Sequence, residues 1–300
     1  MMPRPFLDRS LPMKVVITGA AGQLGQELAR TTPPGVAVTL LTSSDCDIGD
    51  TAAVSAMVVR ERPQVIINAA AYTAVDKAES EIALATRVNA RGPSFLAGAG
   101  TEFRLIQVST DFVFDGTRAR AYRPEDAPNP LSVYGRTKLE GEAPVRSRGA
   151  HGLVLRTSWV YSAGGNNFVK TMLRLMATRP ELRVVSDQVA APTWARGLAD
   201  ALWRAVERPQ LSGVHHWRDA GVASWYDFAV AIAEEAHSLG MLPQPVTVVP
   251  IETRDYPAPA RRPAFSLLDC TQTWRELDLM PPHWRVNLRK MLIEVKEGNA

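Results

Sequence analysis

The chain has 300 residues, of which 46% are hydrophobic and 22% charged, and its 34 basic and 31 acidic residues give a formal net charge of +3. This length can bury a large core, and the ordinary composition argues against collagen-like, disordered or membrane-spanning chains. No block of basic residues suggests nucleic acid as a partner, and Cys46 and Cys270 are too few for a disulfide framework. We expect a cytoplasmic protein that starts naturally at Met13, with no secretory signal in the first twelve residues.

From Met13 onward, short apolar runs alternate with amphipathic stretches, which is typical of strand–helix units around a parallel sheet. The expected strands are residues 14–18, 36–41, 64–68, 105–109 and 153–156. The expected helices are residues 23–30, 51–62, 82–99 and 134–146, with Asp50 capping the second of them. The sequence therefore predicts an α/β fold with a doubly wound parallel sheet of the Rossmann type over residues 13–165.

The alternation loosens after about residue 161. Helical stretches are expected at residues 168–177, 194–207 and 225–239, followed by a strand-like run at 246–251. We expect residues 166–300 to form mainly a smaller C-terminal substrate-binding domain, with some segments returning to the Rossmann sheet. The proline-rich stretch 257–263 is expected to be a loop.

A glycine loop, GAAGQLG, directly follows the first expected strand and opens the first expected helix, with Gly19, Gly22 and Gly25 at its fixed positions. Glycines in this setting allow a tight turn, a close approach of backbone N–H groups to a pyrophosphate, and close packing of helix on strand. Close packing alone also selects glycines. The position between a strand and a helix favours a dinucleotide site over that alternative.

The end of the second expected strand is hydroxylic, with Thr42, Ser43 and Ser44 where an NAD-specific sheet would carry a carboxylate. NADPH is therefore allowed. No arginine in this segment offers a grip on a 2′-phosphate, so we expect NADH to be accepted as well. Asp47 is expected to face the adenine, although an exposed turn carboxylate is an equal alternative.

Tyr134 and Lys138 lie four residues apart in an expected helix, so their side chains share one face. This spacing suits a proton donor and an ammonium group that stabilises its phenolate. A free phenol has a pKa of about 10, and we expect the nearby ammonium to lower the phenol pKa of Tyr134 towards neutral pH. Thr110 ends an expected sheet strand, where its hydroxyl can hold a substrate carbonyl. Taken singly, an aromatic side chain on a helix is commonly core and a threonine at a strand end is commonly a cap.

These residues lie within longer motifs that together resemble the extended short-chain dehydrogenase/reductases, and more narrowly the dTDP-4-dehydrorhamnose reductase family. The motifs are GAAGQLGQEL, NAAAYTAVDKAE (68–79), STDFVFDG (109–116), NPLSVYGRTKLEGE (129–142), RTSWVY (156–161) and DQVAAPT (187–193). The resemblance runs from Met13 nearly to the C-terminus. It implies reduction of the C4 carbonyl of dTDP-4-dehydro-6-deoxy-L-mannose to dTDP-L-rhamnose with NADPH, the last step in making that nucleotide sugar.

The resemblance also assigns residues to the two ligands. It places Gly22, Gln23 and Leu24 over the pyrophosphate, Asp47 and Ile48 beside the adenine, Ala71, Tyr72 and Thr73 along the cofactor, Tyr134 and Lys138 on the nicotinamide ribose, and Thr110, Asp111 and Trp159 on the sugar. Trp159 as ordinary core is the alternative. Arg261 and Arg262, in the proline-bounded loop, are expected either to bracket the substrate diphosphate or to be solvated.

Three alternatives stay open at this point. A 4,6-dehydratase is disfavoured because Asp111 is followed by Phe112 rather than by a glutamate. A reductase of a related dTDP-4-ketosugar, for example of the dihydrostreptose type, and a non-catalytic regulatory subunit both fit the motifs. The resemblance allows a monomer or a homodimer joined through a glutamate-rich magnesium site, but only Glu27 suggests a ligand and Arg196 stands where a carboxylate would help, so we expect no metal.

Overall fold

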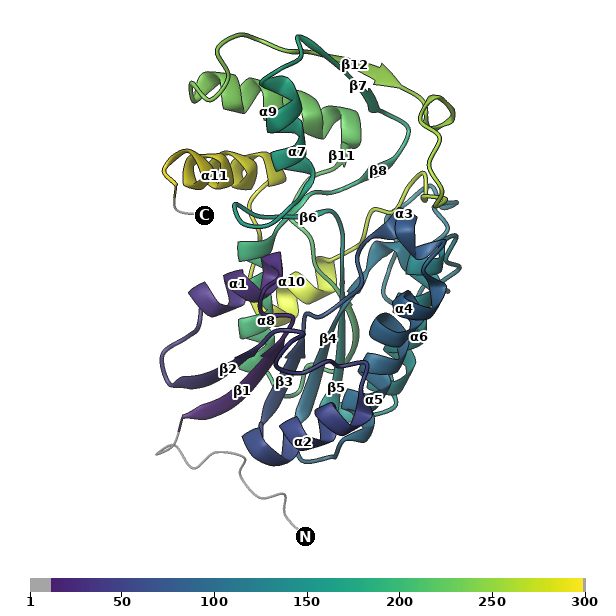
Figure 1. Cartoon of the computed structure of the whole chain (residues 1–300), viewed down its shortest axis with the longest axis vertical. Helices are drawn as coiled ribbons and strands as arrows, with labels where there is room; N and C mark the ends of the chain where they lie inside the picture. Colours follow the sequence, from purple (N-terminus) through teal and green to yellow (C-terminus); the bar gives the residue numbers. More distant parts are fainter. Residues whose placement is uncertain (1–11, 299–300) are drawn as a thin grey trace.

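The structure is a computed structural model and describes residues 12–298. Residues 1–11, on which the expectation about a secretory signal rests, lie outside this range. The main sheet is formed by β1 (Met13–Thr18), β2 (Val36–Leu41), β3 (Val65–Asn68), β4 (Arg104–Thr110), β5 (Gly152–Thr157) and β10 (Gly213–His216). All neighbours in it are parallel, in the order β10-β5-β4-β3-β1-β2 (Figure 1). The predicted α/β fold with a doubly wound parallel sheet is confirmed.

Helices cover both faces of the sheet because its strands are apolar on both sides (Figure 1). One face is covered by α1 (Gln23–Arg30) and α8 (Ala195–Val206), and the other by α2 (Thr51–Glu61), α5 (Gly92–Gly98) and α6 (Val133–Arg146). Along β1 the side chains alternate: Ile17 packs with the α1 and α8 face, whereas Val16 packs with the α2 and α5 face. Asp50 caps α2 as predicted, with its carboxylate accepting from Ala52 N at 2.8 Å.

The helix predicted over residues 82–99 is interrupted. The structure has α4 (Ile82–Thr86), a π-helical turn (Arg87–Arg91) and then α5. Pro93 has no N–H to donate to the carbonyl of Asn89, so regular α-helical bonding cannot continue through this turn. A short helix, α3 (Val75–Ala78), precedes this region.

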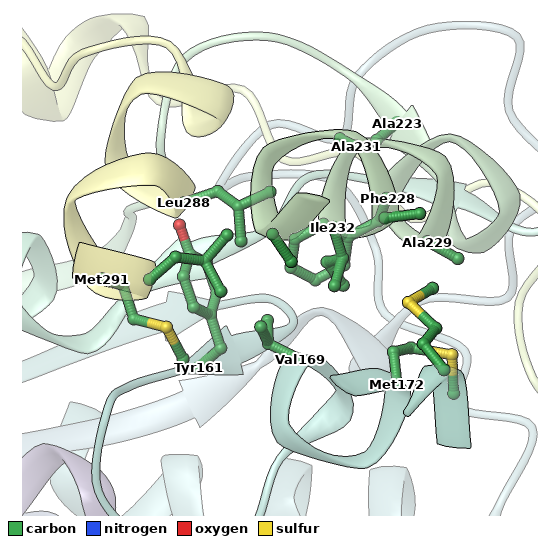
Figure 2. Close-up of a cluster of buried hydrophobic side chains, with 14 of the residues drawn as sticks. Tyr161, Val169, Met172, Ala223, Phe228, Ala229, Ala231, Ile232, Leu288 and Met291 are labelled. Atoms are coloured by element: carbon green, nitrogen blue, oxygen red, sulfur yellow. The ribbon is translucent and has the colours of Figure 1, made fainter. Parts of the chain in front are cut away.

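The C-terminal lobe is defined here as the elements drawn above the sheet in Figure 1. It comprises α7 (Phe168–Met176), β7 (Glu181–Val185), β8 (Val189–Ala190), β11 (Ala223–Ser224), α9 (Trp225–Ser238), β12 (Thr247–Ile251) and α11 (Trp284–Lys296). Figure 2 shows Val169, Phe228 and Leu288, from three different helices, pointing toward a common centre, and all three are fully buried. This lobe therefore has an apolar core of its own.

Short elements connect the lobe to the sheet: β6 (Val160–Tyr161) pairs with β9 (Thr193–Trp194), and α10 (Thr271–Leu277) contacts α8. The chain also returns to the sheet after entering the lobe, because α8 packs against α1 and β10 pairs with β5. Residues beyond 165 therefore complete the main sheet. No helix among residues 12–298 is long and apolar enough to span a membrane.

A buried ion pair joins α6 to the sheet. Glu142 on α6 accepts two hydrogen bonds from Arg156 on β5, at 2.9 and 2.7 Å, and a third from the hydroxyl of Ser109 on β4. All three side chains are at most 3% exposed. Removing one partner of such a pair leaves an uncompensated buried charge, which is costlier than the pair itself is stabilising.

We therefore expect Glu142→Ala to lower the free energy of unfolding by about 3–5 kcal/mol. Glu207→Ala, which breaks the exposed pair with Arg204, is the matched control and is expected to cost less than about 1 kcal/mol. Urea unfolding followed by circular dichroism measures both variants. Equal costs for the two variants would contradict a special role for the buried pair.

Candidate active site

The carboxyl ends of the strands meet at one edge of the sheet, and the strand order reverses between β1 and β3. Open parallel sheets bind ligands at such a switch point. The glycine loop follows β1, the segment with Ala71, Tyr72 and Thr73 follows β3, and Thr110 ends β4. The predicted cofactor and substrate residues of these three loops therefore lie along one edge.

The three glycines of the loop differ in what requires them. Gly19 has a φ of +73°, and a Cβ there would lie 2.6 Å from Ala70 N, while a Cβ on Gly25 would lie 2.3 Å from the Gly19 carbonyl oxygen. Gly22 would meet only that carbonyl oxygen, at 3.2 Å, and as N-cap of α1 it supplies no side-chain cap. Packing and backbone conformation thus explain Gly19 and Gly25. Gly22 leaves the first N–H groups of α1 open to an anion.

Gln23 connects this loop to the C-terminal lobe. Its side-chain oxygen accepts hydrogen bonds from Ser162 Oγ at 3.1 Å and from Asn167 Nδ2 at 2.9 Å. Asn167 also caps α7. The loop between β6 and α7 is therefore held against the start of α1, and Leu24 is buried in the core that α1 and α8 share with the sheet.

At the end of β2, the two aspartates are already engaged. Asp45 accepts from the backbone N and the hydroxyl of Thr42, at 2.8 and 2.6 Å, and these bonds lower the pKa of its carboxyl. Asp47 forms an ion pair with Arg87 from the π-helical turn, and the hydrogen bond from Arg87 lowers the pKa of Asp47. This segment itself contains no arginine, but the fold brings Arg87 to Asp47 from 40 residues further along the chain.

The loop after β3 is fixed by side-chain amides. Asn68 accepts from Thr18 Oγ1 at 2.6 Å and donates to Gln107 at 2.7 Å, which ties together the ends of three neighbouring strands. Asn89, in the π-helical turn, accepts from Tyr72 N at 2.8 Å and donates to Tyr72 O at 3.0 Å. The segment predicted to line the cofactor is therefore held in one conformation.

Thr110 and Tyr134 are brought together by a close approach of α6 to the 3-10 turn Asp111–Val113. A Cβ on Gly135 would lie 2.2 Å from the Phe112 carbonyl oxygen, so only glycine allows this contact. Tyr134 packs edge-on against Phe112, with ring centroids 5.6 Å apart, and its phenol lies near the Thr110 hydroxyl. The close approach of α6 therefore brings the Tyr134 phenol near the Thr110 hydroxyl.

The pKa of the Tyr134 phenol differs from the expectation, and that of Lys138 is shifted as well. Burial raises the pKa of Tyr134 to about 12, and the hydrogen bond to Thr110 opposes this only partly. Burial lowers the pKa of Lys138 to about 8, while the charge of Glu142 acts in the opposite direction. Lys138 Nζ donates to the Val108 carbonyl at 2.7 Å. Desolvation of the phenolate dominates, and the charge of Asp111 acts in the same direction, so the phenol keeps its proton at neutral pH.

A cavity of about 600 Å³ lies on the C-terminal lobe side and contains Arg261 and Arg262. The Arg262 guanidinium is held by Asp76 at 2.8 Å. Trp159, which has a φ of +44°, stacks on Trp225 with ring centroids 3.6 Å apart. The cavity lining that the sequence analysis did not identify includes Phe168, Arg183, Gln188, Trp225, Arg254 and Tyr256. No single sequence motif could identify these residues together, because they come from four separate segments of the chain.

Glu27, the only residue that the sequence suggested as a metal ligand, forms ion pairs with arginine side chains of the chain itself. Its carboxylate is ion-paired with Arg196 and lies 3.5 Å from Arg30. Arg196 also contacts Glu294 at 3.2 Å. Among residues 12–298 no group of three or more His, Cys, Asp and Glu side chains could hold a metal ion. These residues do not fit a magnesium site.

Comparisons with known proteins agree with this geometry. The RmlD substrate binding domain family matches residues 13–297. The dTDP-4-dehydrorhamnose reductase of Burkholderia thailandensis is 42% identical over 285 residues, covering 91% of this chain and 96% of that protein. The reductase of Salmonella typhimurium is 39% identical over 293 residues, covering 94% of this chain and 98% of that protein.

Solved structures show the same similarity. The crystal structure of a dTDP-4-dehydrorhamnose reductase from Clostridium acetobutylicum has a TM-score of 0.89 at 38% identity and covers 95% of this chain and 100% of its own. The Bacillus anthracis reductase, solved in complex with NADP, has a TM-score of 0.89 at 35% identity with the same coverage. With the shared fold and site motifs, these matches confirm the resemblance, and the chain belongs to the dTDP-4-dehydrorhamnose reductase family.

Proposed function

We propose that this chain reduces the C4 carbonyl of dTDP-4-dehydro-6-deoxy-L-mannose with NADPH, giving dTDP-L-rhamnose, in the reducing cytoplasm. The observation that carries the proposal is the convergence of Thr110, Tyr134 and Lys138 at the carboxyl end of β4, on the same sheet edge as the glycine loop. The free, buried Cys46 and Cys270 fit a reducing compartment. The direct test is oxidation of NADPH, followed by absorbance, with the purified sugar nucleotide and identification of the product.

The residues at the switch point fit a dinucleotide. Gly22 leaves the N-terminus of α1 accessible to a pyrophosphate, Gln23 and Leu24 flank it, and Ile48 and Asp47 border the adenine side. A bound reduced nicotinamide supplies the hydride for the reaction. NADH is expected to be accepted too, because residues 42–50 contain no arginine and Arg87, which the fold brings to the β2 end, is paired with Asp47.

Tyr134 donates the proton that the reduced sugar oxygen needs. Its raised pKa keeps Oη protonated until an alkoxide, a far stronger base, develops beside it. Lys138, on the next turn of α6, stabilises the phenolate that remains and anchors the nicotinamide ribose. Thr110 and Asp111 hold the sugar, since both lie where β4 ends next to Tyr134.

The sugar nucleotide occupies the cavity of the C-terminal lobe. Arg261 and Arg262 line it and suit a diphosphate, and Asp76 fixes the Arg262 guanidinium in place. The stacked pair of Trp159 and Trp225 offers an aromatic wall at the lobe, against which C–H faces of a ligand can pack.

Replacing Tyr134 with Phe keeps the ring and its packing on Phe112 but removes the proton, so kcat should fall by about 100- to 10,000-fold. The Kd of NADPH, measured by calorimetric titration, should change little. Tyr161→Phe is the control, because it removes a buried hydroxyl from the apolar core of the C-terminal lobe (Figure 2). A Tyr134→Phe enzyme with half the normal kcat would remove Tyr134 from the mechanism.

Gly22→Val should weaken NADPH binding by about tenfold or more, a loss of about 1.4 kcal/mol, while the fold survives. The side chain would stand between the helix N-terminus and the pyrophosphate, and it meets only one protein atom within 4 Å. Gly25→Val is the contrasting variant, because its Cβ collides with backbone at 2.3 Å and should destabilise the fold itself. Calorimetry and thermal unfolding separate the two effects. Unchanged affinity in a folded Gly22→Val protein would show that the loop serves packing alone.

Cofactor preference should be modest. The hydroxyls of Thr42, Ser43 and Ser44 tolerate a 2′-phosphate, and the chain's preference for NADPH over NADH is expected to be about tenfold in kcat/KM, or about 1.4 kcal/mol. The comparison uses both reduced cofactors at one saturating concentration of sugar nucleotide. A preference for NADH of about a hundredfold or more would mean that Asp45 or Asp47 leaves its partner and binds the ribose.

A further inference from the structure

We propose that Ser266 is a positioning residue for the reduction: its hydroxyl holds the buried Asp111 carboxylate, which in turn fixes the Thr110 hydroxyl beside Tyr134. This inference rests on the proposed function and adds a residue from the C-terminal part of the chain to it.

The hydrogen bonds of this group form a continuous chain. Ser266 Oγ donates to Asp111 Oδ2, and Thr110 Oγ1 donates to Asp111 Oδ1 at 3.2 Å. Phe112 N donates to Thr110 Oγ1 at 3.2 Å, and the Tyr134 phenol lies near the same hydroxyl. Thr110 Oγ1 therefore donates to Asp111 and accepts from Phe112 N, so the Asp111 carboxylate fixes the direction of the Thr110 hydroxyl.

Ser266 is itself held rigidly. Ser266 N donates to the Val189 carbonyl at 2.9 Å, and Val189 N donates to the Ala264 carbonyl at 2.8 Å. The same segment carries Arg262, which lines the cavity and is paired with Asp76. Residues 262–266 therefore contact both the proposed diphosphate site, through Arg262, and the Asp111 carboxylate, through Ser266.

The Asp111 carboxylate has no cationic partner among residues 12–298. Tyr134, from α6, is the titratable group that faces it, while β4 and the C-terminal segment supply the hydroxyls of Thr110 and Ser266. Asp111 is only 1% exposed, and Ser266 only 2%. A buried carboxylate without a cation depends on such hydrogen bonds for its charge, so loss of one of two hydroxyl donors should strongly favour the protonated form.

The direction of the pH effect follows. Burial raises the pKa of Asp111 to about 7, and the hydrogen bond from Ser266 lowers it. Removing the Ser266 hydroxyl therefore raises the pKa of Asp111 further. As pH falls, the Asp111 carboxylate is then protonated at a higher pH than in wild type. Once protonated, Asp111 is a weaker acceptor for the hydrogen bond from Thr110. The acid limb of the pH profile of kcat/KM should therefore move with the pKa of Asp111.

The experiment compares the pH profiles of kcat/KM for wild type, Ser266→Ala and Ser266→Thr. We expect the acid limb of Ser266→Ala to move up by about one to two pH units, with the KM for NADPH unchanged, and Ser266→Thr, which keeps the hydroxyl, to restore the limb. Ser224→Ala is the control, because it breaks another serine–aspartate bond, between the buried Ser224 and the exposed Asp227, away from β4. It should lower stability without moving the limb.

A uniform loss of activity at every pH, or an unmoved limb in folded Ser266→Ala, would overturn the inference. If Ser266→Ala does not fold, Ser266→Cys, a weak donor of similar size, should give a smaller shift in the same direction. A readout without catalysis is the infrared C=O band of protonated Asp111, assigned with Asp111→Asn because the buried Asp219 also has a pKa raised to about 7. The titration midpoint of Asp111 should rise in Ser266→Ala whether or not the wild-type protein reduces the sugar. Failure of wild type to reduce the sugar would refute only the proposed function.

Discussion

The buried ion pair between Glu142 and Arg156 fixes where α6 lies on the sheet, and the site depends on that placement. Its bidentate geometry and the added Ser109 bond offset the cost of burying both charges. A helix that slid along the sheet by one turn would leave both charges unpaired. Lys138 lies one turn before Glu142 on α6, and Tyr134 lies one turn before Lys138. The one ion pair at Glu142 therefore fixes the positions of both functional groups relative to the strand ends.

The sequence was sufficient for features that are encoded locally. Apolar runs on both faces predicted the strands, the spacing of Tyr134 and Lys138 predicted a shared helix face, and Asp50 marked a helix start. The glycine loop could also be placed, because its meaning depends only on the strand before it and the helix after it. What the sequence could not separate was the purpose of each glycine. The distances around Gly22 and Gly25 distinguish ligand approach from packing.

Features that depend on distant segments were missed. Arg87 reaches Asp47 across 40 residues, and Ser266 reaches Asp111 across 155, with no periodic pattern to announce either contact. The π-helical turn also escaped prediction, although Pro93 is a local signal against a regular helix there. The expected lowering of the phenol pKa of Tyr134 was wrong in this structure because charge proximity was read from spacing, whereas burial, which dominates, is a property of the folded chain.

The return of the chain to β10 has a consequence for how this protein folds. The edge strand of the sheet is supplied only after the chain has passed through part of the C-terminal lobe, so pairing of β10 with β5 must close a long loop. Until then β5, buried along its whole length in the finished protein, presents an apolar strand with an unpaired edge. Nascent or shortened chains that end before residue 213 would share this exposed edge and tend to associate with one another through it.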